Sequence, residues 1–562
     1  MRWNHKNEPD SKTVSLLQEK LGVSSTIATL LAQRNINNFE QAKAFFRPDQ
    51  GQIQDPFLML DMDKAVQRLQ KTIDSKEHIM VYGDYDVDGT TSVSMLTHFL
   101  RNLGVGVTPY IPNRYTEGYG LSKIGIETAK ADNIKLMVVV DCGIKAIKQI
   151  EYAKGLGIEV IICDHHNPGD SLPKALAILD PKRNDCSYPN KELCACGVVF
   201  KLIHGLIKNQ GKNIDEIISY LDFVAVATAA DIVPINGENR ALTFLGLHQL
   251  NNSSRPGFKA LKKEKYSKQI ISDIAFGIAP RINAAGRMKH GLYAVELLLA
   301  ESNEEAKLAA SEIENFNTSR REVEKEITKE ALSLIKTKGE ENNASTVVFA
   351  PHWHKGVIGI VASRLIDEHY RPTLVFTKAN EGILAASARS VRDFNVYNAI
   401  DSCSAHIIQF GGHKYAAGVT IREKKYSAFK AAFEKVVDET ITSSQKEKVI
   451  DIDLKLSFAE ITPKLMRLIK QMEPFGPENK RPVFYTEGVF INGHAKLVGP
   501  AKDHLKANFV HGNGGPISAI GFGLGKKIKM LQSNKPISIS YTVEENSWQG
   551  NVALQLNLKD IQ

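Results

Sequence analysis

The sequence of 562 residues has no long apolar run, no apolar leader at its start and no CxxC pair. No apolar stretch approaches the roughly 18 residues that a membrane span needs, which argues against an integral membrane protein. The first residues, MRWNHKNEPDSK, lack the apolar core of a signal peptide. We therefore expect a cytoplasmic protein without a membrane partner. Internal repeats and low-complexity tracts are also missing, which argues against a solenoid or a disordered chain.

Cysteine is scarce, with six residues in the whole chain. In a cytoplasmic protein these are most simply buried or free thiols. Cys194 and Cys196 lie near Cys186 and leave a zinc site open as an alternative, although no second ligand pair follows at zinc-site spacing.

Charge is only mildly unbalanced, since 71 Lys and Arg face 63 Asp and Glu for a net charge of +8. Residues 451–562 contain 14 Lys and Arg against 10 Asp and Glu, which is half of this excess. A regional basic surplus is compatible with a polyanionic partner such as nucleic acid.

Apolar strand candidates alternate with helical stretches from residue 61 to about 300, which predicts an α/β fold with a mostly parallel sheet. Ser302 and Glu305 form a capping-box pattern before a helical stretch that continues to Gly339 and would bridge two domains. A second α/β pattern covers 344–440, and short alternating strands over 448–562 predict a small barrel. The strand candidates of the first region are Ile79–Tyr82, Lys135–Val140, Glu159–Cys163 and Phe223–Ala230.

The stretch Asp84-Tyr85-Asp86-Val87-Asp88-Gly89 resembles the start of an EF-hand calcium loop. An EF-hand needs a bidentate glutamate at loop position 12, where this chain has Met95. The flanks predict a strand before the turn and a helix after it, whereas an EF-hand lies between two helices. The acidic turn is therefore interpreted as part of a site at a strand end.

Each early strand candidate ends in an acid or a histidine, and the carboxyl ends of parallel strands meet along one crevice. Converging carboxylates repel one another unless cations neutralise them, and oxygen ligands with imidazole favour Mn²⁺ or Mg²⁺. Two such ions could activate water and stabilise the leaving oxygen of a phosphodiester. A single Asp often only caps a helix, but that explanation does not account for acid at every strand end. The residues are Asp84, Asp86, Asp88, Asp141, Asp164, His165, His166 and Asp231.

The signatures GDYDVDG, VDCGI, DHH and ADIVP occur in this order and resemble the DHH phosphoesterase superfamily. Further stretches are similar to the RecJ single-strand-specific DNA exonucleases. They are IPNRYTEGYGL (111–121), GIAPRINAAGRM (277–288), WHKGVIGIVASR (353–364), SARS (387–390), FGGHKYAAG (410–418) and EPFGPENKRPVF (473–484).

This resemblance implies a division of the chain into domains and a role for each. The expected parts are an N-terminal helical segment (1–60), a DHH catalytic domain (61–300), a connecting helix (301–343), a DHHA1 substrate-binding domain (344–440) and an OB-fold (448–562).

The resemblance also implies roles for the site residues. His166 would face the scissile phosphate as a catalytic residue, and Asp164 would orient His165. Which aspartate of the first motif bridges the ions stays open. The implied metal ligands are Asp84, Asp86, Asp88, Asp141, His165 and Asp231.

Substrate contacts are expected downstream of the metal site. Residues 281–287 offer cations in a glycine-containing turn that suits a nucleotide backbone, although a turn salt-bridged to the acidic site is an alternative. Ser387, Arg389 and the turn 411–413 could bind a terminal phosphate, which by resemblance is the 5′ end. The expected contacts are Arg114, Arg281, Asn283, Arg287, Ser387, Arg389, Gly411, Gly412 and His413.

In 448–562, aromatic and basic residues could form a platform for single strands, while most of the aromatics would belong to the core. They are Phe475, Phe484, Phe522 and Trp548 with Lys480, Arg481, Lys526 and Lys527.

Together these features predict a metal-dependent exonuclease of DNA repair and recombination that degrades single-stranded DNA from the 5′ end and releases 5′-mononucleotides. A helicase and a single-strand-binding protein are candidate partners. One rival is a phosphodiesterase for cyclic dinucleotides or short oligonucleotides, which needs no extended groove. Another is a DHH-like scaffold that binds single strands without cutting, in which some of the acids would be missing.

Overall fold

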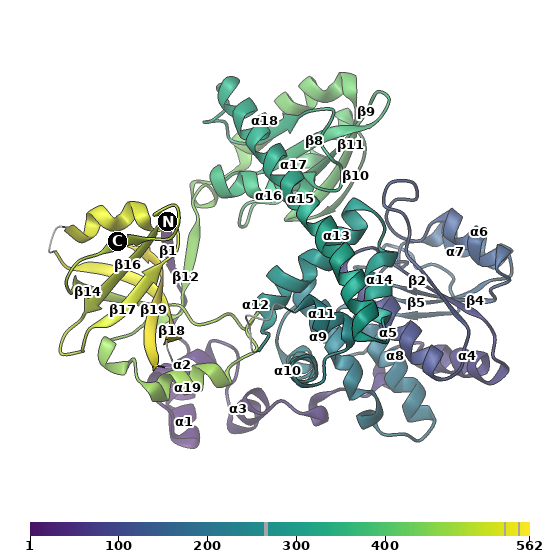
Figure 1. Ribbon diagram of the computed structural model, residues 1–562, viewed down its shortest axis with the longest axis horizontal. Helices are drawn as coiled ribbons and strands as arrows, with labels where there is room; N and C mark the ends of the chain where they lie inside the picture. Colours follow the sequence, from purple (N-terminus) through teal and green to yellow (C-terminus); the bar gives the residue numbers. More distant parts are fainter. Residues whose placement is uncertain (263–267, 533–534, 549–550) are drawn as a thin grey trace. The chain divides into compact units, whose positions relative to one another are not determined.

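The computed structural model describes residues 1–262, 268–532, 535–548 and 551–562. It contains two compact units (Figure 1). The larger unit comprises residues 3–286, 290–311 and 450–562, and the smaller unit comprises 1–2, 287–289 and 312–449. Within the described ranges every helix is too short or too polar to cross a membrane.

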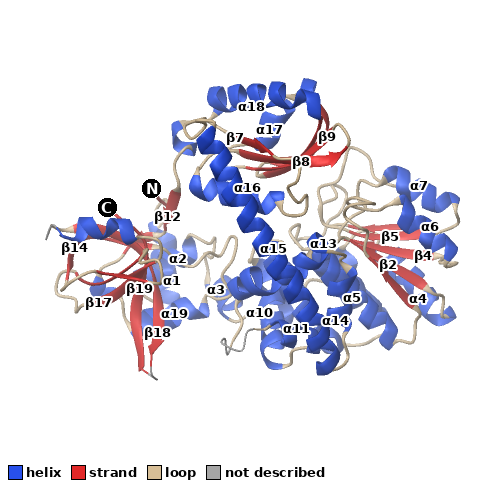
Figure 2. Cartoon of the chain, turned by 45° about the horizontal axis from the view of Figure 1, so that its top comes forward, coloured by secondary structure: helices blue, strands red, loops and turns tan. Residues whose placement is uncertain are grey.

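A five-stranded parallel sheet of order β3-β2-β4-β5-β6 forms the centre of the first α/β part of the larger unit. Strands β2 and β4 are buried at every residue because helices cover both faces of the sheet (Figure 2). The strands are β2 (Ile79–Gly83), β3 (Val107–Tyr110), β4 (Leu136–Val140), β5 (Glu159–Cys163) and β6 (Ala177–Leu179). The helices are α4 (Met62–Ser75), α5 (Val87–Asn102), α6 (Lys123–Ala131), α7 (Ile147–Gly155) and α8 (Ala195–Asn209).

The predicted strand Phe223–Ala230 is wrong, since these residues lie in helix α9 (Leu221–Ala230). The segment is buried on all sides, and such a short apolar run does not distinguish a strand from a core helix. Its four alanines favour the helix. Asp231 therefore follows a helix and not a strand. The following helices are α10 (Gly237–Asn252), α11 (Pro256–Leu261), α12 (Ile271–Asp273), α13 (Ala279–Met288) and α14 (Leu292–Leu299).

The expected turn over 281–287 is also wrong, because this segment lies inside helix α13. A Cβ atom on Gly286 would come within 2.7 Å of the Tyr85 carbonyl oxygen, so the glycine allows close packing of the helix on the acidic turn. The connecting helix α15 (Asn303–Thr337) has the predicted cap, in which Ser302 Oγ accepts a hydrogen bond from the Glu305 amide at 3.2 Å.

The smaller unit contains a mixed sheet of order β10-β11-β9-β8-β7. The expected turn at 411–413 is instead the end of strand β10, which pairs antiparallel with β11. The strands are β7 (Thr346–Phe349), β8 (Thr373–Asn380), β9 (Ile383–Arg389), β10 (Ile407–His413) and β11 (Ala416–Arg422). The helices are α16 (Ile358–Glu368), α17 (Val396–Asp401) and α18 (Tyr426–Thr440).

The C-terminal part of the larger unit is the predicted barrel, an OB domain. Strands β14, β18, β19, β17 and β16 follow one another, and a β14–β16 pairing closes the ring. The elements are β12 (Val449–Ile452), β13 (Leu454–Lys455), α19 (Pro463–Gln471), β14 (Phe484–Ile491), β15 (Lys496–Val498), β16 (His504–Val510), β17 (Ile517–Gly521), β18 (Ile537–Trp548) and β19 (Asn551–Ile561).

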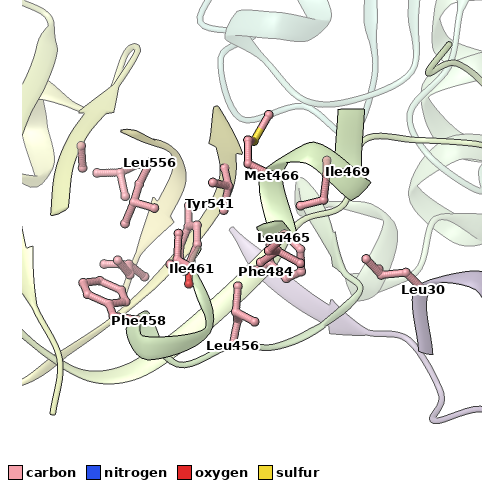
Figure 3. Packing of buried hydrophobic residues seen from close by; sticks show 14 of the residues in the cluster. Leu30, Leu456, Phe458, Ile461, Leu465, Met466, Ile469, Phe484, Tyr541 and Leu556 are labelled. Carbon is pink, nitrogen blue, oxygen red and sulfur yellow. The ribbon is translucent and has the colours of Figure 1, made fainter. Parts of the chain in front are cut away.

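The first helices of the chain share the core of this C-terminal barrel. Leu30 of α2 is fully buried in one apolar cluster with Phe484 and Tyr541 of the barrel (Figure 3). Leu465 and Ile469 of α19 belong to the same cluster. The segment 1–60 therefore precedes the first domain in the sequence but shares a core with the last domain in the structure. Its elements are β1 (Arg2–His5), α1 (Ser11–Leu21), α2 (Ser25–Ala32) and α3 (Phe39–Phe46).

Arg240 of α10 anchors the start of the EPFGPENKRPVF stretch through hydrogen bonds to its backbone carbonyls. Its guanidinium donates to the carbonyl oxygens of Met472 at 3.0 Å and Glu473 at 2.7 Å, and also to that of Phe45 at 2.9 Å. The Ile235 amide adds a hydrogen bond to the Pro477 carbonyl at 2.8 Å. We call Arg240 with the carbonyls of 471–474 the arginine clasp.

Candidate active site

The first acidic group is positioned by the junction of β2 and α5. Asp84 follows the strand directly, and Asp86 is the N-cap of the helix, where its Oδ1 accepts a hydrogen bond from the Gly89 amide at 3.0 Å. Asp88 lies in the first helical turn and accepts hydrogen bonds from the amides of Ala195 and Cys196 at 2.7 and 2.8 Å. A Cβ atom at Gly89 would lie 2.3 Å from the Asp84 carbonyl oxygen, so this tight turn needs glycine.

His165 is the meeting point of three further acids. Its Nε2 lies 3.3 Å from Asp141 Oδ1, 3.7 Å from Asp88 Oδ2 and 3.7 Å from Asp231 Oδ2. Asp141 follows β4 with a φ of 58°, a left-handed conformation that is costly for a residue with a side chain. The structure thus brings together acids from β2, β4 and α9 with the histidine that follows β5. We call Asp84, Asp86, Asp88, Asp141, His165 and Asp231 the acidic edge.

Asp164 orients a different histidine from the one expected. Its Oδ1 accepts a hydrogen bond from His166 Nδ1 at 2.7 Å, and its Oδ2 accepts one from the Ile144 amide at 2.9 Å. The Nδ1 of His165 has no hydrogen-bond partner among the described residues. The expectation that Asp164 orients His165 is therefore wrong. The sequence does not distinguish adjacent rings, because the choice depends on which imidazole faces the buried carboxylate.

The electrostatics of the acidic edge are those of crowded, buried carboxylates. Burial, together with neighbouring carboxylates, raises the pKa of Asp84, Asp88 and Asp141 well above the usual range. Desolvation and the charge of Asp86 raise the pKa of Asp231 to about 7. Without added positive charge, the ionised forms of these carboxylates are disfavoured.

The two histidines are shifted in opposite directions. Burial lowers the pKa of His165 to about 4, which leaves a neutral ring able to bind a cation. Burial also opposes the charging of His166, but its hydrogen bond with Asp164 and the charges of Asp164, Asp231 and Asp86 together outweigh this and raise its pKa to about 9. His166 is thus a cation next to a crowded set of carboxylates.

The residues of the acidic edge fit a divalent cation. Buried Asp84 Oδ1 and His165 Nδ1 have no hydrogen-bond partner among the described residues, and the donor set consists of carboxylate oxygens with imidazole nitrogen. Three groups of possible ligands have their atoms within 4.8 Å of one another. They are Asp84, Asp86 and Asp141; Asp88, His165 and Asp231; and Asp141, His165 and His166.

The zinc alternative receives no support in the described part of the chain. All six cysteines are buried and free, as expected, and the ligand groups found there contain no cysteine. Burial raises the pKa of Cys194 and Cys196, which disfavours the thiolate that zinc requires. Cys194 instead caps helix α8, where its Sγ accepts a hydrogen bond from the Gly197 amide at 3.4 Å.

An aromatic and cationic rim lies beside the acidic edge and includes a residue not singled out in the sequence. Tyr119 places its hydroxyl 3.3 Å from His166 Nε2. Arg114, an expected substrate contact, lies 4.0 Å over the Tyr85 ring, and its charge lowers the pKa of Asp84 against the larger effect of burial. Tyr119 belongs to the IPNRYTEGYGL stretch, and this motif is the sequence signal that points to it.

Helix α13 carries three of the expected substrate contacts. In the larger unit, Arg281 Nη1 donates to the Gly277 carbonyl at 2.7 Å, and Asn283 is half-buried two residues further on. Arg287 belongs to the smaller unit, where its Nη1 donates to the Gly356 carbonyl at 3.0 Å.

The remaining expected contacts form a row across the sheet of the smaller unit. Gly411 pairs with Gly418, which pairs with Ser387, and His413 pairs with Ala416, which pairs with Arg389. Arg389 Nη1 donates to Ser387 Oγ at 3.0 Å, and a Cβ atom on Gly359 of α16 would lie 2.8 Å from that hydroxyl. Gly412, between the two, has a φ of 145°. Burial lowers the pKa of Arg389. We call Ser387, Arg389, Gly411 and His413 the Arg389 row.

The aromatic platform expected in 448–562 is mostly core. Phe484 is fully buried and Phe475 packs on the same cluster, whereas Phe522 is 60% exposed. Lys527 pairs with Asp560 at 3.3 Å, and Lys526 is exposed. The side chain of Trp548 lies outside the described residues.

Known proteins match this chain over its whole length. Family models match residues 78–228 (DHH family, N-terminal domain), 342–439 (DHHA1 domain) and 452–560 (RecJ OB domain). The single-stranded-DNA-specific exonuclease RecJ of Bacillus subtilis is 36% identical over 100% of this chain and 70% of its own length. Crystal structures of RecJ from Thermus thermophilus match over 100% of this chain. The Mn²⁺ complex has a TM-score of 0.85 at 27% identity over 79% of that chain, and the Mg²⁺ complex 0.79 at 25% over 78%.

Proposed function

Because this chain belongs to the RecJ family of single-stranded-DNA-specific exonucleases, we propose that it degrades single-stranded DNA from the 5′ end and releases 5′-mononucleotides. It is a metal-dependent exonuclease that uses Mn²⁺ or Mg²⁺, in DNA repair and recombination. The observation that carries this function is the convergence of Asp88, Asp141 and Asp231 within 3.7 Å of His165 Nε2.

Two cations would be held by the acidic edge, that is by Asp84, Asp86, Asp88, Asp141, His165 and Asp231. When bound, they supply the positive charge that activates water and stabilises the leaving oxygen. The raised pKa values of Asp84, Asp88 and Asp141 support this assignment, because ionising these carboxylates requires a compensating charge.

His166 is the residue of this chain that would act directly on the phosphate. Its Nδ1 is held by Asp164 at 2.7 Å, which leaves Nε2 as the donor on the side of Tyr119. With a pKa of about 9 the ring is protonated at neutral pH, so Nε2–H would hydrogen-bond a phosphate oxygen and stabilise its negative charge. Asp164 acts through His166 as a positioning residue.

The single strand would be bound by residues from several elements. Arg114 lies over Tyr85 beside Asp84, and Arg281 and Asn283 follow on α13. In the smaller unit, the half-buried guanidinium of Arg389 and the hydroxyl of Ser387 form a donor pair suited to a terminal phosphate, with Gly411, Gly412 and His413 on β10, beyond the intervening strand β11, and Arg287 on α13.

We assign the functional parts to 1–60 (helical segment), 61–300 (DHH catalytic domain), 301–343 (connecting helix), 344–440 (DHHA1 substrate-binding domain) and 448–562 (OB domain). Action in the cytoplasm, together with a helicase and a single-strand-binding protein, is part of the same proposal. The regional basic surplus of 451–562 supports a strand-binding role for the last domain.

The test is digestion of end-labelled single- and double-stranded DNA and RNA with Mn²⁺, Mg²⁺ or Ca²⁺. We expect single-stranded DNA to shorten from its 5′ end with Mn²⁺ or Mg²⁺. Ca²⁺ should support little turnover, because it accepts loose geometry and activates water poorly. Shortening from the 3′ end, or turnover with Ca²⁺ equal to that with Mn²⁺, would contradict the proposal.

A further inference from the structure

Phe276 is a large aromatic residue that the fold exposes to solvent on an ordered turn. Its exposed fraction is 81%, whereas the neighbouring Ile274 and Ile278 are buried. These residues form a single π-helical turn, η4 (Ile274–Ile278), between α12 and α13. Such turns cost stability and are frequent at functional sites. An exposed ring in this position has no role in the core of the protein.

A small pocket lies beside this ring and contains an unsatisfied hydrogen-bond donor. The pocket has a volume of about 110 Å³ and is lined by Phe276, Gln269, Asp273 and Arg281, among others. Gln269 is 3% exposed, and its Nε2 has no hydrogen-bond partner among the described residues. Asn251 fixes the backbone of Gln269 through hydrogen bonds of 2.7 and 3.0 Å. A residue that lines this pocket thus carries a buried amide donor with no acceptor in the described part of the chain.

The charged groups at the pocket have defined positions. Asp273 Oδ2 accepts a hydrogen bond from the Ile270 amide at 3.1 Å, so its charge is engaged in the local turn. Arg281 folds back along the helix and donates to the Gly277 carbonyl, the residue that follows Phe276. The guanidinium thus lies within one helical turn of the exposed ring.

Helix α13 connects this pocket with the acidic turn. Gly286 packs on the Tyr85 backbone, next to Asp84 and Asp86. The ten residues from Phe276 to Gly286 span about 15 Å of helix, or about four nucleotides of a stacked strand at 3.4 Å each. The pocket thus offers an aromatic ring, a buried amide donor and a cation at about this distance from the acidic turn. These groups suit one nucleotide of a strand whose end lies at the acidic edge.

We propose that Phe276 stacks on a base of the single-stranded substrate about four nucleotides to the 3′ side of the cleaved bond, while Gln269 Nε2 donates to an acceptor of that base. Arg281 faces the phosphate backbone at this step. This assignment rests on the proposed function. Since every base has an aromatic face, the contact works with any sequence and retains the strand between cuts.

The experiment uses the full chain with Phe276→Ala, Phe276→Leu and Phe276→Tyr. The control is Phe39→Ala, which removes an aromatic ring of α3 that is 47% exposed. Substrates are a 5′-phosphorylated trinucleotide, which is too short to reach Phe276, and a strand of about 20 nucleotides, longer than a typical single-strand site. The readouts are KM and kcat with Mn²⁺, the affinity for the long strand from fluorescence anisotropy with Ca²⁺, and thermal melting.

For Phe276→Ala we expect KM and Kd for the long strand to rise about 5- to 100-fold. Kinetics on the trinucleotide should stay within about twofold, because removing an exposed ring leaves the acidic edge intact. Phe276→Tyr should restore long-strand binding, and Phe276→Leu should not, because it keeps the apolar volume but loses the aromatic face. Phe39→Ala should match the wild type.

Long strands with one abasic position locate the contact. In the wild type, an abasic nucleotide near position four or five should weaken binding, whereas Phe276→Ala should respond equally at all positions. The proposal is overturned if Phe276→Ala impairs both substrates equally, binds the long strand normally or keeps the wild-type abasic profile. If the wild type binds the long strand but cuts neither substrate, the proposed function fails, and the anisotropy data still decide the stacking contact.

Discussion

Charge of opposite sign gathers in the acidic edge and in the Arg389 row, and among the described residues neither set contains a charged group of the other sign. In the acidic edge, burial and mutual repulsion raise the pKa of Asp84, Asp88 and Asp141. In the Arg389 row, burial alone lowers the pKa of the guanidinium, whose hydrogen bonds go to Ser387 Oγ and the Ala388 carbonyl. Under the proposed function, metal cations would add to the charge of His166 beside the acidic edge, and the terminal phosphate would supply the counter-charge of Arg389.

Arg240 is a buried arginine whose role is structural. Burial lowers its pKa to about 9, yet its guanidinium donates to carbonyl oxygens of Phe45, Met472, Glu473 and Pro474. Arg240 is 2% exposed and donates to several carbonyl oxygens, whereas Arg389 is half-buried and donates only to Ser387 Oγ and the Ala388 carbonyl among the described residues. A shifted pKa marks a ligand site only where the protein leaves donors or acceptors unused.

The largest expected effect tests the acidic half of this comparison. Asp141→Asn should lower cleavage by about 10²- to 10³-fold, the typical cost of removing one preorganised group that stabilises charge at the reacting centre. Binding of single-stranded DNA should persist. Asp74→Asn, a change of an exposed acid on α4, is the matched control. Near-normal turnover of purified Asp141→Asn in a single-turnover assay would remove Asp141 from the metal site.

The next effect tests the cationic half. Arg389→Ala should weaken binding of a 5′-phosphorylated strand about 10- to 100-fold, the range for losing a charge-assisted hydrogen bond. A strand with a 5′-hydroxyl should be affected much less, and the salt dependence of long-strand binding should be unchanged. Titrations with both 5′ ends at several salt concentrations measure this. An equal loss for both ends would show that Arg389 does not bind a terminal phosphate.

Adding the cation should stabilise the protein, and more so at higher pH. A raised pKa, such as that of Asp231 near 7, gives stability that is present at low pH and lost as pH rises through the folded value. The metal-free protein should therefore melt at lower temperature at about pH 8 than at about pH 6. Mn²⁺ at 100 times its Kd should add about 2.7 kcal/mol to the free energy of unfolding. Melting curves in EDTA and in Mn²⁺ check this; a Mn²⁺ shift that shrinks as pH rises would contradict it.

The two buried arginines should respond in opposite ways to replacement. Arg240→Met should lower the free energy of unfolding by about 1–3 kcal/mol, because it leaves buried carbonyl oxygens without donors. Its preference for a 5′-phosphate should be unchanged. Arg389→Met should lose that preference with little loss of stability. Denaturant unfolding together with the binding titrations separates the two cases, and the same profile for both variants would refute the distinction.

The smallest expected effect concerns the last domain. Lys526 is exposed, and replacing it with Gln should reduce the slope of log affinity against log salt by about 0.7 if it contacts one phosphate. A point change is needed here, since deleting residues 446–562 would expose the apolar helices that share the barrel core. Titration of a long strand across salt gives the slope. An unchanged slope would place Lys526 outside the strand path.

The sequence predicted the acidic edge because the carboxyl ends of parallel strands meet whatever connects them. The predicted strand Phe223–Ala230 was wrong, since an apolar run of eight residues fits a core helix as well as a strand, although Asp231 joins the acidic edge as expected. The turn predicted for residues 281–287 was also wrong. Gly286 suggested a turn there, but it allows the helix to pack closely on Tyr85. Tyr119 and the partner of Asp164 depend on side-chain directions that no spacing encodes.

The shared core of the first helices and the last domain has a consequence for how the protein is made. Leu17, Ile27 and Leu30 leave the ribosome early, but Phe484 and Tyr541, which share their core, follow about 450 to 520 residues later. At 5–20 residues per second, this delay lasts about 20–100 s. During this time an apolar surface remains exposed. A truncated messenger RNA that lacks the last domain should therefore yield a protein that aggregates or requires a chaperone. The last domain thus completes the folding of the first segment to be synthesised.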